Sequence, residues 1–288
     1  MSASAFRATG SCTRHDDLKS DRTEQWIALG QTAADEVIGP PGDSPEDSWS
    51  LMRACCVAPV VQLIRASRPR LFALSGPVGA GKSTVASAVS RSLAKVGMRA
   101  VALSMDDFYL SRREREGRGI AWRAAPGSHD IDLMVQTLTA IRNGSRPLSL
   151  PRFDPSRDDR STDERLEDAP DVVLFDGWIL GYDGQGYGRI LPFLDWHLHL
   201  DVPTDVARER RFARETKLRE ETGGAFSPEE MQQFWDEVLG PGMDTWVPAS
   251  AEHADIVVRF TETGPSCLAD PRLDEFLPDP DATRRMPT

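Results

Sequence analysis

The chain has little cysteine, little lysine and no long apolar run. Its four cysteines form no Cys-x-x-Cys pair and no cluster at metal-ligand spacing, which is typical of a reducing compartment. No uninterrupted apolar stretch approaches the roughly 20 residues that cross a bilayer, and the first residues contain no apolar signal-peptide segment. The sequence therefore predicts a cytoplasmic protein without a membrane segment.

Basic residues are scarce relative to acidic ones. The 288 residues include 45 Asp and Glu against 34 Lys and Arg, which gives a formal net charge of -11. Such a field repels polyanions, so the composition argues against a nucleic-acid partner, and any anionic ligand must be captured locally. With 40% hydrophobic residues, the chain has the composition of an ordinary globular protein and not of a disordered one.

The two ends of the chain differ from its centre. Residues 1–45 are polar and include Gly39-Pro40-Pro41-Gly42, so we expect a flexible N-terminal extension there, with a helix near Glu24 to Val37. Residues 264–288 are rich in Pro and Asp and show no periodicity, which predicts a loosely held C-terminal tail. Residues 46–263 would then form the folded domain.

Several short runs of apolar and β-branched residues predict buried strands: Arg70 to Ser75, Arg99 to Ser104, Asp171 to Asp176, Trp196 to Asp201 and Asp255 to Phe260. Their hydrophobicity is nearly continuous, and helical stretches separate several of them, as in a parallel sheet covered on both faces. The predicted fold class is therefore α/β. A helix from Leu51 to Ser67 would bury Cys55 and Cys56 as small apolar side chains. His197 and His199 share one face of a strand, where we expect hydrogen-bonded core residues and not a metal site.

A glycine-rich segment directly follows the first predicted strand. It matches G-x-x-x-x-G-K-S and leads into an alanine-rich helical run, the context in which such a loop binds phosphates. Glycines allow backbone conformations closed to other residues, so successive N–H groups can point at phosphate oxygens beside a helix N-terminus. Lys82 would reach the β- and γ-phosphates, and Ser83 would ligate Mg²⁺. The predicted nucleotide contacts are Gly76, Pro77, Val78, Gly79, Ala80, Gly81, Lys82, Ser83 and Thr84.

The rest of the sequence separates the classes of protein that share this loop. The sequence has no N-K-x-D tetrapeptide for guanine, and its D-x-x-G match at Asp183 lies in a glycine-rich loop where chance explains it, which disfavours a switch GTPase. Carboxylates instead end two predicted strands, at Asp106, Asp107 and Asp176. Ligands bind beyond the carboxyl ends of parallel strands, so we expect these groups near the γ-phosphate. We assign Asp106 as the base and Asp176 as the Mg²⁺-side carboxylate; the alternative is that they only cap helices or turns.

The segment Ser104-x-Asp106-x-Phe108-Tyr109 resembles the S-x-D-x-F-Y segment of the uridine kinase, phosphoribulokinase and pantothenate kinase superfamily, whose first Asp serves as the base. The resemblance covers roughly Arg70 to Phe260. It implies a P-loop NTPase fold of three α/β/α layers around a mainly parallel five-stranded sheet, with a substrate-binding insertion and an Arg-rich lid helix.

Later segments resemble the plant-type D-glycerate 3-kinase branch more closely than the nucleoside kinases. They are Gly127-Ser128-His129-Asp130, Pro151-Arg152-Phe153-Asp154 ending in Arg160, and Leu174 to Gly181. One departure is Asp176, because the plant-type enzymes usually carry Glu there. The shorter side chain reaches less far toward Mg²⁺, so a water molecule could lie between its carboxylate and the ion.

Residues 105–170 separate the second and third strands, far more than the roughly dozen residues that a βαβ crossover needs. We expect this insertion to build the acceptor pocket. D-glycerate carries its carboxylate at the far end from the reacting hydroxyl, and arginine holds carboxylates bidentately. The resemblance implies Arg152 and Arg160 as the cations, with Arg157 or Arg123 as alternatives. The other predicted acceptor residues are Asp107, Tyr109 and His129, the last as a hydroxyl or carboxylate donor.

A basic helix follows the fourth strand, over about residues 204–224. The resemblance implies a lid that closes over the nucleotide, excludes water and offsets charge on the transferring phosphoryl group. Arg208 and Arg211 are the predicted catalytic arginines, with Arg214 on roughly the same face. The alternative is a solvated helix whose arginines pair with neighbouring glutamates.

Together these features predict an ATP-dependent kinase that uses Mg²⁺ and phosphorylates the primary hydroxyl of a small organic acid. The resemblance implies D-glycerate as the acceptor and 3-phosphoglycerate as the product. One alternative is a nucleoside (uridine) or pantothenate kinase with the same Asp106 chemistry, and another is a nucleotide-gated regulatory ATPase. The sequence leaves the oligomeric state open.

Overall fold

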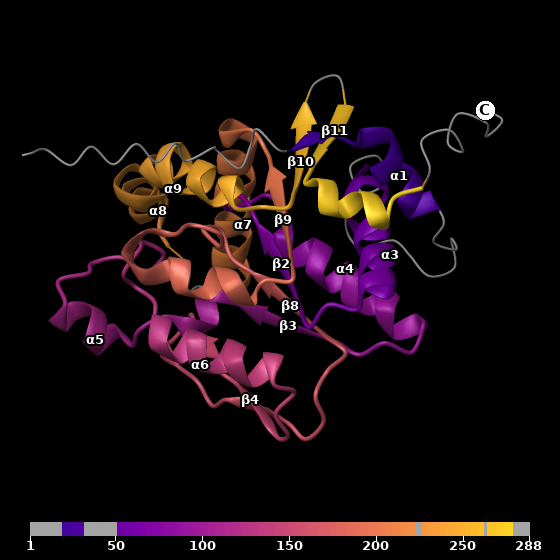
Figure 1. Ribbon diagram of the computed structural model, residues 1–288. Coiled ribbons are helices and arrows are strands. Elements are labelled where there is room, and N and C mark those ends of the chain that lie inside the picture. Colours follow the sequence, from indigo (N-terminus) through magenta and orange to yellow (C-terminus); the bar gives the residue numbers. More distant parts are fainter. Residues whose placement is uncertain (1–18, 32–50, 223–225, 262–263, 279–288) are drawn as a thin grey trace, which may run out of the picture.

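The computed structural model describes residues 19–31, 51–222, 226–261 and 264–278 (Figure 1). At its centre lies a seven-stranded sheet with the strand order β1-β11-β10-β9-β2-β8-β3. The five strands from β10 to β3 run parallel to one another and are the strands predicted from the sequence. Their bounds are Leu71–Ser75 for β2, Ala100–Ser104 for β3, Val172–Asp176 for β8, Trp196–Asp201 for β9 and Ile256–Thr261 for β10. The structure thus confirms the α/β class.

The central strands β2 and β8 are apolar at almost every position because both faces of the sheet are covered. Every residue of these two strands is buried. Side chains alternate between the faces: Phe72 and Leu74 of β2 join one hydrophobic cluster, whereas Leu71 and Ala73 join the other. The continuous apolar runs in the sequence therefore reflect two cores, one on each side of the sheet.

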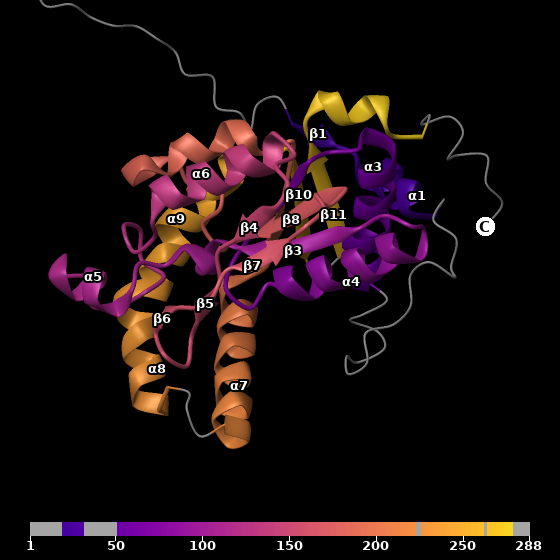
Figure 2. The ribbon, with the colours of Figure 1, turned by 90° about the horizontal axis from the view of Figure 1, so that it is seen from below.

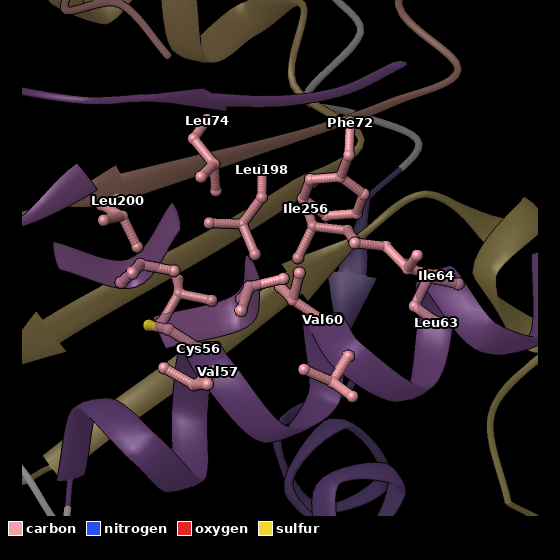
Figure 3. Packing of buried hydrophobic residues seen from close by; sticks show 14 of the residues in the cluster. Cys56, Val57, Val60, Leu63, Ile64, Phe72, Leu74, Leu198, Leu200 and Ile256 are labelled. Atoms are coloured by element: carbon pink, nitrogen blue, oxygen red, sulfur yellow. The ribbon is translucent and has the colours of Figure 1, made fainter. Parts of the chain in front are cut away.

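One face of the sheet is covered by α1 (Thr23–Gln31), α3 (Ala58–Ser67) and α4 (Lys82–Lys95), as Figures 1 and 2 show. A π-helical turn, η2 (Arg53–Val57), leads into α3. Figure 3 shows side chains of the strands packed against those of η2 and α3; the labelled strand residues are Phe72, Leu74, Leu198, Leu200 and Ile256.

The opposite face is covered by the helices α6, α8 and α9, together with two connecting helical turns, η4 and η5 (Figure 2). Their bounds are Ile131–Arg142 for α6, Gly184–Phe193 for η4, Pro228–Phe234 for α8, Trp235–Leu239 for η5 and Gly240–Glu252 for α9. The three layers expected from the sequence are therefore present.

Two predictions about buried side chains are confirmed. Cys55 and Cys56 lie in the core, and burial raises the pKa of the Cys55 thiol to about 11. His197 and His199 are buried in β9 and share a hydrogen-bond partner, the Ser75 hydroxyl, which lies 2.6 Å from Nε2 of the first and 2.8 Å from Nδ1 of the second. Burial lowers the pKa of both imidazoles to about 3, so they are neutral core residues.

The chain ends differ from the prediction. We expected a loosely held tail from residue 264 onward, but β11 (Gly264–Ala269) pairs antiparallel with β10, and η6 (Pro271–Glu275) follows it. Near the other end, β1 (Ser20–Asp21) pairs with β11, and α1 confirms the start of the predicted helix. These segments are held by backbone hydrogen bonds to a neighbouring strand, which local composition does not reveal. The rest of both predicted extensions lies outside the described residues.

The insertion after β3 lies along the β3 side of the sheet and over the face that carries α6 (Figure 1). Its elements besides α6 are η3 (Met105–Phe108), α5 (Arg112–Gly117), β4 (Leu148–Leu150), β5 (Phe153–Asp154), β6 (Asp159–Arg160) and β7 (Glu164–Leu166). The strand β4 pairs with β7, and β5 pairs with β6, both antiparallel.

The predicted lid segment is the helix α7 (Thr204–Thr222), which extends beyond the sheet beside α8 in Figure 2. It begins directly after β9, at the edge of the sheet where the parallel strands end. Among the helices that the structure describes, none combines the length and the apolar character needed to cross a membrane.

Candidate active site

The loop between β2 and α4 requires glycine at its turning points. Gly76, Gly79 and Gly81 have φ values of 138°, 82° and 92°, conformations that other residues rarely adopt. A Cβ atom at Gly76 would lie 2.4 Å from the Leu200 carbonyl oxygen, and one at Gly79 would lie 2.5 Å from that of Ala207. The loop is therefore pressed against the end of β9 and the first turns of α7. This geometry fits the predicted phosphate cradle.

Lys82 opens α4 and folds back over the loop. Its Nζ donates hydrogen bonds to the carbonyl oxygens of Gly76 and Pro77, both at 2.8 Å. Burial lowers the pKa of Lys82 to about 8, although the nearby carboxylates of Asp176 and Asp106 act in the opposite direction. The side chain is thus a partly buried cation held by neutral oxygens, a state that a phosphate anion would stabilise.

Asp176 ends β8 beside the phosphate loop, with 8% of its surface exposed. Its carboxylate oxygen Oδ2 accepts a hydrogen bond of 2.8 Å from the Ser83 hydroxyl. Hydroxyl and carboxylate oxygens are the hard donors that Mg²⁺ prefers, so these two side chains fit a magnesium ion. The structure therefore brings together the two residues predicted to hold the metal.

Asp106 follows β3, which pairs with β8 so that Ser104 lies opposite Asp176. The Asp106 side chain is open to solvent, yet enough protein surrounds it that desolvation raises the pKa of its carboxyl. The Tyr109 hydroxyl donates a hydrogen bond to this carboxylate, and the charges of Asp176 and Lys82 are close enough to shift its pKa. Asp106, Asp176 and Lys82 thus share one site at the carboxyl edge of the sheet.

Asp107 accepts hydrogen bonds from the neighbouring polypeptide. Its Oδ2 accepts hydrogen bonds from the Ser104 N–H at 3.0 Å and from Nη1 of Arg152 at 2.8 Å, and its Oδ1 accepts one of 3.3 Å from the Phe153 N–H. The bond to Ser104 completes a capping box that fixes the turn carrying Asp106. Although we predicted Asp107 to bind the acceptor, both of its oxygens hold the surrounding backbone and Arg152, which fixes the turn that carries Asp106.

Tyr109 and His129 form a buried stacked pair, with ring centroids 4.4 Å apart. The Tyr187 hydroxyl lies 2.6 Å from His129 Nδ1 and accepts a hydrogen bond of 3.2 Å from the backbone N–H of Gly127. Burial lowers the pKa of His129 to about 3, and Nε2 has no hydrogen-bond partner among the described residues. A buried polar nitrogen thus remains beside Tyr109.

The arginines predicted to bind the acceptor are already engaged with carboxylates. Arg152 uses Nε, Nη1 and Nη2, which donate to Glu164, to Asp107 and to the Ala102 carbonyl oxygen. Arg160 donates to Asp130 at 2.7 Å. Arg152 therefore fastens the insertion to β3, and Arg160 holds β6 against the start of α6. We had expected both side chains to point toward the acceptor.

The lid arginines differ in their surroundings. Arg208 donates to Gln232 of α8 at 2.8 Å, and its guanidinium lies over the Phe212 ring, 4.4 Å from the centroid. Arg211 is largely buried and pairs with Glu215 at 2.5 Å. Arg214 lies close enough to Lys82 to lower the pKa of that lysine. Of the three, Arg214 is thus the one whose charge acts directly on the phosphate loop.

Several residues that build the site were not predicted from the sequence. Tyr187 lies in a glycine-rich loop with no pattern that links it to His129, and Asp158, which pairs with Arg115 and Arg123, is one of many acidic residues. The segment after β8 was found by resemblance, and the structure explains its glycines by close packing. A Cβ at Gly177 would lie 2.7 Å from Met105 Cβ.

The parallel sheet, the glycine loop at the start of α4 and the carboxylates at the ends of β3 and β8 define a P-loop kinase fold. The chain belongs to the phosphoribulokinase / uridine kinase family, whose model matches residues 71–263.

Curated relatives match part of the chain. It is 32% identical over 133 residues to "Uncharacterized kinase mug58" of Schizosaccharomyces pombe, which covers 40% of this chain and 48% of that protein. It is 31% identical over 132 residues to chloroplastic D-glycerate 3-kinase of Arabidopsis thaliana, covering 40% of this chain and 29% of that protein. The chain thus spans less than half the length of either relative.

A solved structure shows the same fold. The D-glycerate 3-kinase from Cryptococcus neoformans var. grubii superposes with a TM-score of 0.52 at 18% sequence identity, over 67% of this chain and 85% of that chain. This likeness supports the P-loop kinase architecture.

Proposed function

We propose that the protein transfers the γ-phosphoryl group of ATP to the primary hydroxyl of D-glycerate, which yields 3-phosphoglycerate and ADP. The observation that carries this proposal is the placement of Asp106, whose carboxylate shares the edge of the sheet with Lys82 and Asp176. This shared position supports Asp106 as a base that acts next to a terminal phosphate held by the phosphate loop.

In the proposed reaction, Asp106 accepts the proton of the acceptor hydroxyl. The hydroxyl oxygen bonds to the γ-phosphorus while the bond between the γ-phosphorus and the ADP oxygen breaks. Desolvation raises the pKa of Asp106, so its carboxylate is a stronger base than an ordinary aspartate, and the hydrogen bond from Tyr109 orients it. Lys82 offsets negative charge on the β- and γ-phosphates. When bound at Ser83 and Asp176, Mg²⁺ supplies further neutralisation of phosphate charge.

The acceptor side of the proposal rests on the insertion. The buried Nε2 of His129 has no partner among the described residues, and a hydroxyl group of the bound acceptor would satisfy it. His129 stacks on Tyr109, which bonds to Asp106, so this nitrogen belongs to the same cluster as the proposed base. Two of the similar proteins are named D-glycerate 3-kinase, which supports this acid over other acceptors.

The proposal keeps α7 as the lid. Arg214 is near Lys82, and Arg211 is near Arg123, whose charge reaches Asp106. These lid arginines are therefore placed to offset charge on the transferring group. Arg208 would need to leave Gln232 to take the catalytic part that the resemblance implies.

The alternative acceptors are a nucleoside or pantothenate, because the family includes uridine kinases and all of these reactions can use Asp106. An alternative of another class is a nucleotide-gated regulatory ATPase. A kinase releases ADP only when its acceptor is present, whereas such an ATPase hydrolyses ATP alone or with a protein partner.

A coupled ADP-release assay over D-glycerate, pantothenate, uridine and ribulose 5-phosphate tests the proposal. We expect ADP release only with D-glycerate, together with formation of 3-phosphoglycerate. Release with uridine alone would replace the acceptor, and release without any acceptor would replace the class of activity. Lys82→Ala is the matched control for contaminating kinases, since it removes the cation of the phosphate loop.

A further inference from the structure

Arg123 precedes the Gly127-Ser128-His129-Asp130 segment and has part of its guanidinium uncommitted. Its Nη1 donates hydrogen bonds to the Pro155 carbonyl oxygen and to Asp158, each at 3.1 Å. Within the described part of the chain, Nε and Nη2 make no hydrogen bond. These two groups form one planar edge of the guanidinium, the edge that matches the two oxygens of a carboxylate.

The same side chain lies on the base side of the insertion. The Arg123 guanidinium is placed over the Phe153 ring, 5.9 Å from its centroid, and the Phe153 ring meets that of Tyr109 at 5.3 Å. Tyr109 in turn donates its hydroxyl hydrogen to Asp106. The charge of Arg123 also lowers the pKa of both Asp106 and Arg211, so it acts on the base and on the lid.

Three other arginines of the insertion donate to internal partners. Arg152 has donors from all three nitrogens engaged, and Arg160 pairs with Asp130. Arg115 is buried and donates to Asp158 and to a backbone carbonyl oxygen. Arg123 differs from them because Asp158 fixes one end of its guanidinium and leaves the opposite edge for a ligand.

Trp122, the residue before Arg123, contacts the helical segment α8–η5 that follows the lid helix α7. The Trp122 ring lies 5.2 Å from that of Phe234, and its Nε1 donates to Glu237 at 2.5 Å. Both partners belong to the helical segment after α7. Arg123 is thereby held in two ways: its side chain bonds to Asp158, and its backbone neighbour Trp122 packs against α8 and η5.

We propose that Arg123 binds the carboxylate of the acceptor through Nε and Nη2 and makes the site selective for hydroxy acids over neutral alcohols. The inference rests on the proposed function, because it takes Asp106 as the base and a small hydroxy acid as the acceptor. It assigns the carboxylate to one side chain, in place of Arg152 and Arg160. The chemistry recognised is a short acid whose carboxylate and primary hydroxyl are held at once by Arg123 and Asp106.

The test compares D-glycerate with D-glyceramide, its uncharged amide, as acceptors for the wild-type enzyme and for Arg123→Gln. We expect the wild-type enzyme to prefer the acid in kcat/KM by about 10- to 100-fold, the usual worth of a hydrogen bond to a charged group. Arg123→Gln should raise the KM for D-glycerate by a similar factor and change kcat/KM for the amide much less than kcat/KM for the acid. Arg123→Lys keeps the positive charge but cannot donate two parallel hydrogen bonds. Its KM for D-glycerate should therefore lie between those of the wild-type enzyme and Arg123→Gln.

Arg157→Gln is the matched control, because Arg157 is exposed in the loop between β5 and β6 and was an alternative cation. It should keep the wild-type preference. Titration with a fluorescent ATP analogue establishes that Arg123→Gln still folds and binds nucleotide. If it does not fold, the wild-type comparison still decides, since equal kcat/KM for acid and amide overturns the assignment.

The outcomes separate the two proposals. Use of D-glycerate with an unchanged KM in Arg123→Gln overturns the assignment of Arg123 and leaves the D-glycerate kinase standing. A wild-type enzyme that uses only neutral acceptors overturns both. Loss of the acid preference in Arg123→Gln, with the amide reaction retained, supports both.

Discussion

The Ser83 hydroxyl donates to the Asp176 carboxylate across 2.8 Å, and this hydrogen bond joins the phosphate loop to the end of β8. Asp176 also lies opposite Ser104 in the sheet, and Ser104 precedes Asp106 by two residues in the chain. A short path therefore connects the nucleotide side of the site to the proposed base. Substitutions along this path separate metal and nucleotide binding from proton transfer.

We expect Asp176→Asn to raise the Mg²⁺ concentration for half-maximal activity by about 10- to 100-fold. The amide can still accept the hydrogen bond from Ser83, so the loss reports the missing charge. A Mg²⁺ titration of ADP release measures it. Asp176→Glu keeps the charge and should stay close to wild type. An identical Mg²⁺ dependence in Asp176→Asn and wild type would remove this residue from the metal site.

Nucleotide affinity should depend on the protonation of Lys82, because desolvation lowers the pKa of this side chain to about 8. A triphosphate stabilises the protonated amine, so binding above this pH takes up a proton and weakens as the pH rises. We expect the Kd of a fluorescent ATP analogue to increase by up to about tenfold per pH unit above about pH 8. Lys82→Arg stays protonated and should show a flat profile. Equal slopes in the two proteins would assign the titration to another group.

Gly79 and Gly97 offer a matched pair for the shape of the phosphate loop. Their φ values are 82° and 75°, but a Cβ at Gly79 would meet the Ala207 carbonyl oxygen at 2.5 Å, whereas no described atom lies within 4 Å of one at Gly97. We expect Gly97→Ala to lower the free energy of unfolding by about 1 kcal/mol. Gly79→Ala should lower it by about 2–4 kcal/mol and weaken nucleotide binding. Urea denaturation measures both, and equal losses would refute the close packing against α7.

The lid arginines should not contribute equally. Arg214 acts on Lys82, whereas Arg208 is stacked on Phe212 and bonded to Gln232. We expect Arg214→Gln to lower kcat by about 10²-fold, the scale of a lost charge-stabilising donor, with little change in stability. Arg208→Gln should instead cost about 0.5–1 kcal/mol of stability. Steady-state kinetics and thermal unfolding of both variants decide the point; the reverse order of kcat would favour Arg208 as the catalytic arginine.

The parallel strands and the phosphate loop could be predicted because their signals are local. A strand covered on both faces is apolar throughout, as β2 and β8 are, and the loop needs glycine at fixed spacings. Asp106 and Asp176 followed from a general rule about strand ends. By contrast, β11 begins with Gly264-Pro265 and obtains its hydrogen bonds from β10, so its own sequence gave no strand signal.

The acceptor residues were harder to predict because long-range ion pairs decide which arginine is occupied. Arg152 meets Asp107, which lies 45 residues earlier in the chain, and Arg123 meets Asp158, which lies 35 residues later. No local pattern distinguishes a side chain that holds the insertion together from one with a free edge. The orientation of His129 likewise depends on Tyr187, 58 residues away.

The most direct test of the proposed chemistry is the Asp106→Asn variant, assayed for both nucleotide binding and acceptor-dependent ADP release. Because the amide cannot take up the hydroxyl proton, we expect D-glycerate phosphorylation to fall by about 10²- to 10⁴-fold while the affinity for a fluorescent ATP analogue stays near wild type. Phosphorylation at the wild-type rate by a correctly folded Asp106→Asn protein would contradict the assignment of Asp106 as the base.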